Sequence, residues 1–168
     1  MPFKKALIIS TTLFVVFYSL LNLLFTKFLY IGINFSPSLP QKYLIGVRNT
    51  RDIKKGDLIV FRFKGDDFAP KGLQFFKKVV CVPGDKLEVN PQKREFYCNG
   101  KFIGRALNYS CKEHKPVYPF VFNGTIPKGK YFVIGTDKCS YDSRYWGFVD
   151  KSQIVAKILW TFGRLEDK

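Results

Sequence analysis

The sequence has a single histidine, few acidic residues and no closely spaced cysteine motif. A Ser-His-Asp triad would have to use His114, which lies in an irregular segment. The four cysteines show no C-x-x-C spacing, so a zinc site would need thiols from scattered loops, and we expect no metal. The chain also lacks internal repeats and heptads, which excludes solenoids and coiled coils.

Acidic residues are scarce: the chain has 13 Asp and Glu against 28 Lys and Arg, and its formal net charge is +15. Such an excess predicts an anionic partner, either nucleic acid or an anionic membrane surface. The basic residues are spread along the whole chain rather than clustered with aromatics, so we expect no nucleic acid. Of the 168 residues, 46% are hydrophobic and 17% are aromatic, which excludes a disordered chain.

A long apolar run near the N-terminus favours the membrane. Ala6–Thr26 carries no charge and is long enough to cross the hydrocarbon core as a helix, for which about 20 residues are needed. The apolar core of a cleaved signal peptide is usually about 7–15 residues and ends in a small-x-small site. Neither feature is present here, so the sequence predicts an uncleaved anchor with the lipid bilayer as a partner.

The charges beside this run predict its orientation. Lys4 and Lys5 favour a cytoplasmic N-terminus, and Lys27 on the other side opposes them slightly. We therefore predict that residues 1–27 form a cytoplasmic tip and a single transmembrane anchor. Residues 28–168 would then form a domain outside the cytoplasm, where much of the positive charge attracts lipid headgroups.

The sequence after the anchor predicts a mostly β fold. Short apolar or β-branched runs alternate with Gly and Pro turns, which indicates many short strands in a sandwich or barrel-like body. An Asn99-Gly100 pair between apolar residues predicts a hairpin. The expected strands are 28–34, 43–47, 58–63, 74–85 with a closing turn, 86–89, 131–134 and one or two within 148–160.

Two segments are expected to be less regular. Gly104–Phe122 is predicted to be a long excursion on the domain, and 135–147 a polar loop. Cys98 and Cys111 lie on either side of the start of this excursion. A disulfide between them is compatible with an oxidising compartment, and the sequence assigns no partner to the other two cysteines.

Two adjacent lysines lie in the strand expected at Gln74–Asp85. Successive side chains on a strand face opposite sides, so Lys77 shares a face with Phe75 and Lys78 lies on the other. A lysine on an apolar face loses hydration, which lowers its pKa and makes it a candidate general base near neutral pH. The alternative is a strand edge with two solvated lysines.

Two serines lie in the proline-rich segment Phe35–Pro40, which is unsuited to a helix or a central strand. A neutral lysine is able to activate a serine nucleophile, which makes Ser38 and Lys77 a candidate pair. Ser36 would place a second hydroxyl near the oxyanion of the same reaction. Two alternatives stay open: the segment is a juxtamembrane linker, or Ser36 is the nucleophile and the register shifts by two.

These residues resemble the signal peptidase I family of membrane-anchored serine proteases. The resemblance follows nearly the whole chain: an apolar anchor, a serine turn, K-G-D-L-I-V-F at 55–61, K-K-x-x-x-x-P-G-D at 77–85 and D-S-R-x-W-G-x-V at 142–149. It implies a mostly β catalytic domain that cleaves preproteins on the outer face of the bacterial inner membrane. It also implies a dyad of Ser38 as nucleophile and Lys77 as general base, without metal or cofactor.

The resemblance also implies roles for residues around the dyad. Ser36 matches the family's oxyanion serine, and Ser140 matches the serine that orients the lysine. Asp142 and Arg144 match its supporting ion pair. One position departs from the pattern: Cys81 stands where the family usually has glycine, so close packing there must be met by a small thiol.

The serine turn departs as well. The family's Ser-Met-x-Pro box is absent, and the proline after Ser38 comes one position early. N-x-S-x-S-x-P at 34–40 instead resembles the conjugative-transfer branch, the TraF-type peptidases that trim pilin precursors. This resemblance implies a conjugative pilin or a similar secretion substrate as the precursor partner. The alternatives are a general type I signal peptidase and a non-catalytic, membrane-tethered module of a secretion complex.

Overall fold

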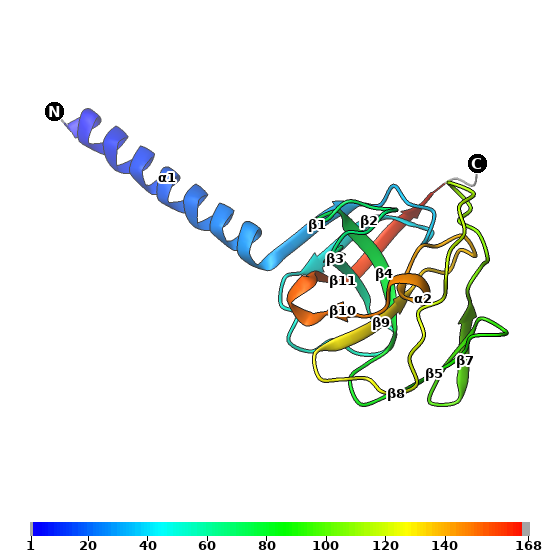
Figure 1. The fold of residues 1–168 in the computed structure, drawn as a ribbon. Coiled ribbons are helices and arrows are strands. Elements are labelled where there is room, and N and C mark those ends of the chain that lie inside the picture. The colour runs from blue at the N-terminus through cyan, green and yellow to red at the C-terminus, as the bar shows by residue number, and fades with distance from the viewer. Residues whose placement is uncertain (1, 166–168) are drawn as a thin grey trace.

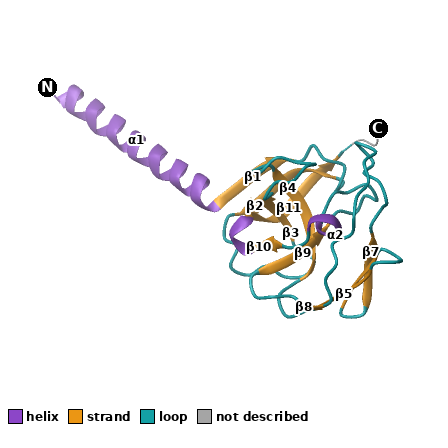
Figure 2. Cartoon of the chain, in the orientation of Figure 1, coloured by secondary structure: helices purple, strands orange, loops and turns teal. Residues whose placement is uncertain are grey.

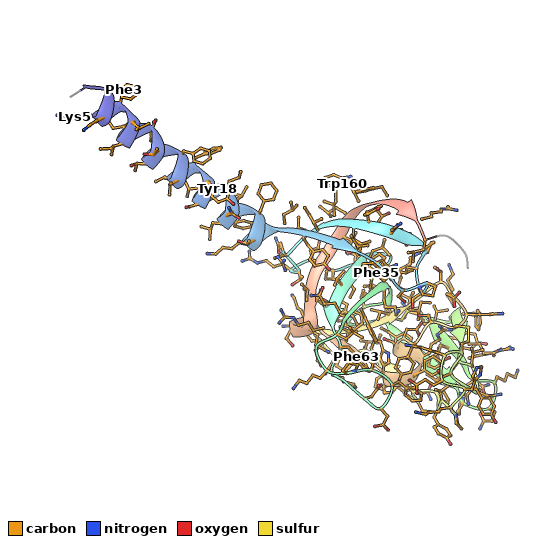
Figure 3. All side chains as sticks on the ribbon, turned by 90° about the horizontal axis from the view of Figure 1, so that it is seen from above. Phe3, Lys5, Tyr18, Phe35, Phe63 and Trp160 are labelled. Atoms are coloured by element: carbon orange, nitrogen blue, oxygen red, sulfur yellow. A yellow bond between two sulfur atoms is a disulfide. The ribbon has the colours of Figure 1, made fainter. Side chains whose placement is uncertain are left out.

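The computed structural model describes residues 2–165, with one long helix extending away from a β-rich body (Figure 1). The helix, α1 (Pro2–Phe28), includes the whole predicted Ala6–Thr26 run and extends beyond it at both ends. Phe3–Phe28 is long and apolar enough to cross a membrane, judged by length and composition. Its side chains project into open space on all sides (Figure 3).

The small polar residues of α1 are satisfied within the helix. Thr12 Oγ1 donates to the carbonyl of Ile8 at 2.9 Å, and Thr26 Oγ1 donates to that of Asn22 at 2.8 Å. Such bonds pair these hydroxyl donors with carbonyls of the preceding turn. The polar residues within the apolar run are therefore compatible with an apolar environment.

The larger part of the described body is a seven-stranded antiparallel sheet in the order β1-β2-β11-β3-β4-β9-β10 (Figure 2). Because β1 follows α1 directly, the helix joins the sheet at its edge (Figure 1). The strands are β1 (Leu29–Ile33), β2 (Gln41–Val47), β3 (Leu58–Arg62), β4 (Gln74–Cys81), β9 (Lys130–Ile134), β10 (Val149–Asp150) and β11 (Ile154–Arg164).

A smaller sheet of four strands, in the order β7-β6-β5-β8, completes the described body. Its strands are β5 (Lys86–Asn90), β6 (Glu95–Cys98), β7 (Lys101–Arg105) and β8 (Gly124–Thr125). The hairpin between β6 and β7 turns at Asn99 and Gly100, whose φ angles are 51° and 74°. Two successive residues at positive φ are what a two-residue hairpin turn requires, which confirms the predicted hairpin and the mostly β fold.

The segment predicted to be a polar loop contains a helical turn, α2 (Ser143–Trp146). The Asp142 side chain is its N-cap and accepts the backbone N–H of Arg144 at 3.2 Å. This cap stabilises the helical turn locally. The predicted final strand region is interrupted as well. A 3₁₀ turn, η1 (Lys151–Gln153), separates β10 from β11.

One cluster of the hydrophobic core lies beneath the serine turn, the segment Phe35–Pro40 that carries Ser36 and Ser38. Leu39 and Phe76 are buried there, together with apolar residues of β2, β3 and β11. A second cluster, with Cys81, Phe96 and Phe132 among its members, joins the two sheets. Leu39 of the serine turn and Phe76 of β4 therefore pack in one cluster, and Cys81 at the end of β4 packs in the other.

The cysteines form two disulfides, and the predicted pair is wrong. Cys81 bonds to Cys98, and Cys111 bonds to Cys139, so Cys98 and Cys111 are not joined to each other. The reason is the direction of the side chains. Cys98 on β6 points into the core between the sheets, where the end of β4 brings Cys81, whereas Cys111 lies exposed on the excursion.

Candidate active site

Asn34 closes the turn that carries the two serines. Its side-chain amide donates to the carbonyls of Leu39 and Gln41, both at 2.9 Å, and its Oδ1 accepts the backbone N–H of Ser36 at 2.9 Å. One buried side chain therefore satisfies three backbone groups of a proline-rich segment that has no sheet partner of its own. This arrangement fixes the directions in which the two serines point.

Ser36 and Ser38 present their hydroxyls to each other. The two Oγ atoms are 2.9 Å apart, and Ser38 is 7% exposed. The carbonyl of Ser38 accepts the backbone N–H of Thr136 at 2.8 Å and that of Asp137 at 3.3 Å. The serine turn is thus bound to the loop between β9 and α2, which also carries Ser140.

Lys77 lies in β4 with only 3% of its surface exposed, whereas Lys78 is exposed on the opposite face. Its Nζ lies 5.4 Å from the centre of the Phe75 ring. Within residues 2–165 this Nζ forms no hydrogen bond that would offset the hydration an ammonium group loses on burial. Strand alternation and burial together distinguish the two neighbouring lysines.

Burial is the largest cause that lowers the pKa of Lys77, which falls from 10.5 to about 8. The carboxylates of Asp142 and Asp137 oppose this shift, and the guanidinium of Arg144 adds to it. With a pKa near 8, about a tenth of the lysine is neutral at pH 7. A neutral amine beside a serine hydroxyl is able to accept its proton.

Ser140 is 2% exposed, and its hydroxyl has no hydrogen-bond partner within the described chain. It approaches the serine turn so closely that a side chain at Gly135 would not fit. A Cβ at Gly135 would lie 2.3 Å from Ser140 Oγ and 2.5 Å from the Ser38 carbonyl oxygen. Glycine at this position lets the loop and the serine turn approach each other.

A buried ion pair supports this loop. Asp142 and Arg144 are joined by two bonds of 2.8 Å, Nε to Oδ1 and Nη2 to Oδ2. Asp142 Oδ2 also accepts the backbone N–H of Gly135 at 2.9 Å. Arg144 donates further to the carbonyls of Arg105 and Ser140, at 2.8 and 3.3 Å. The pair therefore fixes both ends of the loop that faces Ser38.

Two adjoining hollows open at the serines. The first, of about 770 Å³, is lined by Ser36, Ser38 and Lys77 together with mainly apolar residues of β1 and β4. The second, of about 450 Å³, is lined by the same two serines and by Ser140. The structure thus brings Ser36, Ser38, Lys77 and Ser140 to one place, and the other two predicted residues, Asp142 and Arg144, lie behind it.

Sequence reasoning missed the parts played by Asn34 and Gly135. Each lies in a stretch that the sequence had already marked, the N-x-S-x-S-x-P turn and the 135–147 loop. Asn34 acts through contacts within its own turn, whereas Gly135 approaches Ser38, which is distant in sequence. His114 is exposed and lines neither hollow, so it is not placed to complete a triad with Ser38.

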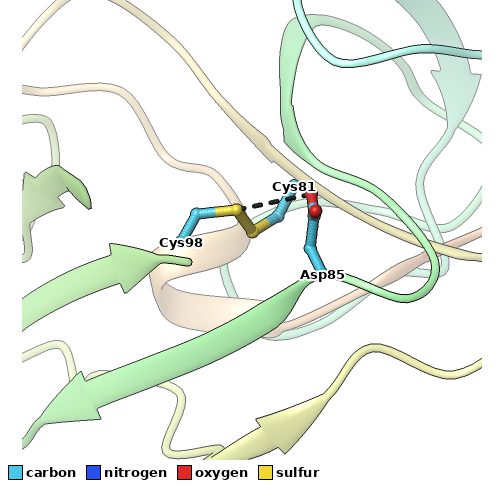
Figure 4. A group of neighbouring side chains, drawn as sticks. All are labelled: Cys81, Asp85 and Cys98. Atoms are coloured by element: carbon cyan, nitrogen blue, oxygen red, sulfur yellow. Dashed lines mark hydrogen bonds between the residues drawn. A yellow bond between two sulfur atoms is a disulfide. The ribbon is translucent and has the colours of Figure 1, made fainter. Parts of the chain in front are cut away.

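One further group has the composition of a metal site. The ligand atoms of Cys81, Asp85 and Cys98 lie within 4.8 Å of one another, and Cys98 Sγ is 3.5 Å from Asp85 Oδ2 (Figure 4). Both sulfurs belong to the Cys81–Cys98 disulfide, so neither is available as a thiolate ligand. Asp85 instead accepts the N–H of Val82 and closes the turn after β4.

The chain is similar to known proteins over most of its length. Residues 4–162 match the family model described as signal peptidase, peptidase S26. The chain belongs to the signal peptidase family. Signal peptidase IB of Staphylococcus aureus (strain Mu50 / ATCC 700699) is 31% identical over 171 residues, which cover 89% of this chain and 83% of that protein. Membership of the signal peptidase family implies a serine endopeptidase that acts on precursor proteins.

Two further relatives were found. Probable signal peptidase I-2 of Synechocystis sp. (strain ATCC 27184 / PCC 6803 / Kazusa) is 30% identical over 119 residues, covering 67% of this chain and 49% of that protein. A crystal structure of a signal peptidase I from Enterococcus faecalis V583 is 25% identical with a TM-score of 0.43, covering 65% of this chain and 98% of that chain.

Proposed function

We propose that this chain is a membrane-anchored serine endopeptidase that removes leader segments from exported precursors. Ser38 is the nucleophile and Lys77 the general base. The observation that carries the proposal is their common position: both side chains are nearly buried and line one hollow, where burial lowers the pKa of Lys77 to about 8. A solvated surface lysine would have neither property.

The reaction follows from this geometry. Neutral Lys77 accepts the proton of Ser38 Oγ as that oxygen bonds to the scissile carbonyl carbon, and the Ser36 hydroxyl donates to the oxyanion. When the C–N bond breaks, the Lys77 ammonium returns its proton to the leaving amine. Water, or an amine of the precursor, then attacks the acyl-enzyme with Lys77 again as base. We propose that Ser140, whose hydroxyl has no hydrogen-bond partner among the described residues, orients the lysine during the reaction, and that no metal or cofactor takes part.

β4 offers an edge to an extended substrate. β3 pairs with Gln74–Lys78, but β9 pairs only from Lys78 onwards, so among the described strands Gln74–Lys77 has a neighbour on one side alone. We propose that the precursor adds as a strand here, beside Gly32–Ser38, through main-chain hydrogen bonds. The apolar lining of the first hollow would then hold small side chains before the cut.

The anchor and the orientation belong to the same proposal. Residues 1–27 would form a cytoplasmic tip and a single transmembrane span, with residues 28–168 on the outer face of the bacterial inner membrane. The support is the apolar surface of α1, the basic pair Lys4 and Lys5, and the net charge of +15. Trp160, 67% exposed, projects from the body and would suit a membrane interface (Figure 3).

Two substrate classes each have an observation in their favour. The N-x-S-x-S-x-P turn, which Asn34 closes, favours a conjugative pilin or a similar secretion substrate. The names of the relatives, signal peptidase IB and probable signal peptidase I-2, favour a general signal peptidase for secretory preproteins. The same dyad would cleave either class of substrate. The two classes differ only in the side chains that fill the two hollows.

The test is a cleavage assay on the purified full chain in detergent. A secretory preprotein and a conjugative pilin precursor are incubated with the protein, and the products are weighed by mass spectrometry. Ser38→Ala and Lys77→Ala should each abolish cleavage in a folded protein. Cleavage of the pilin alone indicates a dedicated maturation peptidase, and cleavage of both indicates a general one. A folded protein that cleaves neither would favour a non-catalytic membrane-tethered module.

A further inference from the structure

The excursion after β7 carries a compact turn over the site. The turn is Ser110–Lys115, which we call the Lys112 turn. The backbone N–H of Ser110 donates to the carbonyl of Lys115 at 2.8 Å, and that of His114 donates to the carbonyl of Ser110 at 3.0 Å. His114 adopts a φ of 54°, which bends the chain back on itself. Lys112 therefore lies on a closed turn rather than on an open loop.

This turn is covalently fixed to the site. The Cys111–Cys139 disulfide joins it to the residue that precedes Ser140. The same loop donates two backbone N–H groups to the Ser38 carbonyl. The base of the excursion is also held, because the Leu107 N–H donates to the Tyr145 hydroxyl at 2.9 Å. Lys112 is thus connected to the candidate nucleophile through one disulfide and one hydrogen-bonded loop.

Lys112 is the only basic residue other than Lys77 that lines either hollow, within the described part of the chain. It lines both hollows, as do the two serines. No carboxylate lines the first hollow, and among residues 2–165 no acidic side chain forms an ion pair with Lys112. Of the two carboxylates at the second hollow, Glu113 pairs with Lys115 at 2.9 Å and Asp137 accepts the N–H of Cys139.

We propose that Lys112 determines substrate specificity by favouring precursors that carry a carboxylate side chain directly beside the scissile bond. The inference rests on the proposed function and adds a charge requirement to it. Because Lys112 and Ser38 both line the two hollows, a substrate segment that fills them meets the ammonium group as well as the candidate nucleophile. The disulfide reduces the freedom of the turn, so less conformational entropy is lost when the ion pair forms.

The experiment uses the full chain in detergent and three peptides that differ at one position. Each peptide has alanines before the cut and Glu, Gln or Lys directly after it. An ion pair near the surface changes a binding or rate constant a few-fold. We therefore expect kcat/KM to fall about fivefold from the Glu peptide to the Gln peptide, and to fall again from the Gln peptide to the Lys peptide. Lys112→Glu should reverse this order, and Lys112→Gln should make the three peptides equivalent. Raising the salt concentration should reduce the preference of the unaltered protein.

Lys138→Glu is the matched control. This lysine is exposed, lies beside Cys139 and lines neither hollow, so the substitution makes the same change in net charge without facing the substrate. It should retain the order Glu, Gln, Lys. In a double Cys111→Ser, Cys139→Ser variant the ratio of kcat/KM between the Glu and Lys peptides should become smaller. The Lys112 turn is then no longer joined to the loop that carries Cys139.

Binding of the same peptides to the Ser38→Ala protein, measured by fluorescence anisotropy, separates this proposal from the catalytic one. Tighter binding of the Glu peptide, reversed by adding Lys112→Glu, supports the role of Lys112 whether or not cleavage occurs. Equal binding of all three peptides, or the same order in the Lys112→Glu protein, overturns it and leaves the Ser/Lys dyad unaffected. Loss of the preference in the Lys138→Glu control would also overturn it.

Discussion

At the scale of single residues, Lys77 combines two opposing demands. A general base must be neutral part of the time near pH 7, and only burial with few compensating bonds achieves this for a lysine. The same burial is unfavourable for folding whenever the side chain is protonated. Lys77 is 3% exposed and has a pKa of about 8. From these two values we predict how the cleavage rate and the free energy of unfolding each depend on pH.

The rate of cleavage should rise with pH. In the proposed mechanism only neutral Lys77 accepts the Ser38 proton, so kcat/KM should increase about tenfold between pH 7 and pH 9, with a midpoint near 8. The measurement is a series of initial rates in buffers of constant ionic strength. A flat profile, or one with a midpoint near the usual lysine pKa, would contradict the assignment of Lys77.

Replacing the base should stabilise the protein. The pKa of Lys77 is lower in the folded chain than in the unfolded one, so the unfolded state binds more protons and wild-type stability rises between about pH 8 and 10.5. Below that window Lys77→Met should raise the free energy of unfolding by up to about 3 kcal/mol. Above it the gain should vanish.

Urea denaturation at pH 7 and at pH 10.5 measures this difference. Lys78→Met is the matched control, because Lys78 is exposed on the same strand and its removal should change stability by less than about 0.5 kcal/mol. Equal effects of the two substitutions at pH 7 would show that Lys77 carries no burial penalty.

At the scale of elements, the loop between β9 and α2 is the part that assembles the site. The Asp142–Arg144 pair fixes it from behind, and its N–H groups hold the Ser38 carbonyl in front. Its closest approach is at Gly135, where a Cβ would meet two neighbouring oxygen atoms. The position of Ser38 relative to Lys77 therefore depends on a residue with no side chain.

Gly135→Ala should reduce kcat/KM by about a hundredfold, because a Cβ 2.3 Å from Ser140 Oγ and 2.5 Å from the Ser38 carbonyl must displace one of them. Gly46→Ala is the control. Its Cβ would lie 2.3 Å from the Lys157 carbonyl, so it is equally crowded but distant from the serines. It should lower stability and leave the activity of the folded protein intact. Similar activity losses in both variants would indicate a general folding defect.

At the scale of the whole molecule, covalent links join parts that strand pairing leaves separate. Cys81–Cys98 connects the larger sheet to the smaller one, and Cys111–Cys139 connects the excursion to the loop between β9 and α2. The first disulfide is buried, with 0% and 3% of its cysteines exposed, and the second is exposed. The two should therefore differ in their access to reductants.

A mild phosphine reductant applied to the folded protein should open Cys111–Cys139 and leave Cys81–Cys98 intact. Alkylation followed by mass spectrometry should then label two cysteines, and all four only after denaturation. Labelling of Cys81 or Cys98 in the folded protein would show that the sheets separate readily. The same samples should show whether cleavage falls when the exposed disulfide opens.

The sequence by itself determined what depends on neighbouring residues. The apolar run set the helix, Asn99-Gly100 set a hairpin, and alternation along β4 placed its two lysines on opposite faces, because each follows from local backbone geometry. The site residues were found through motifs, and their roles stay predictions. The tertiary structure alone decided what depends on distant segments.

Strand order and packing decide three features: the pairing of the cysteines, the close approach of Gly135 to Ser38, and the position of Lys112 at the hollows. The Cys98–Cys111 pairing failed for that reason. Proximity in sequence says little about proximity in space once β4 and β6 have brought Cys81 and Cys98 to opposite sides of one core. A β-rich fold is built from long-range contacts, and these are fixed by the packing of the whole chain.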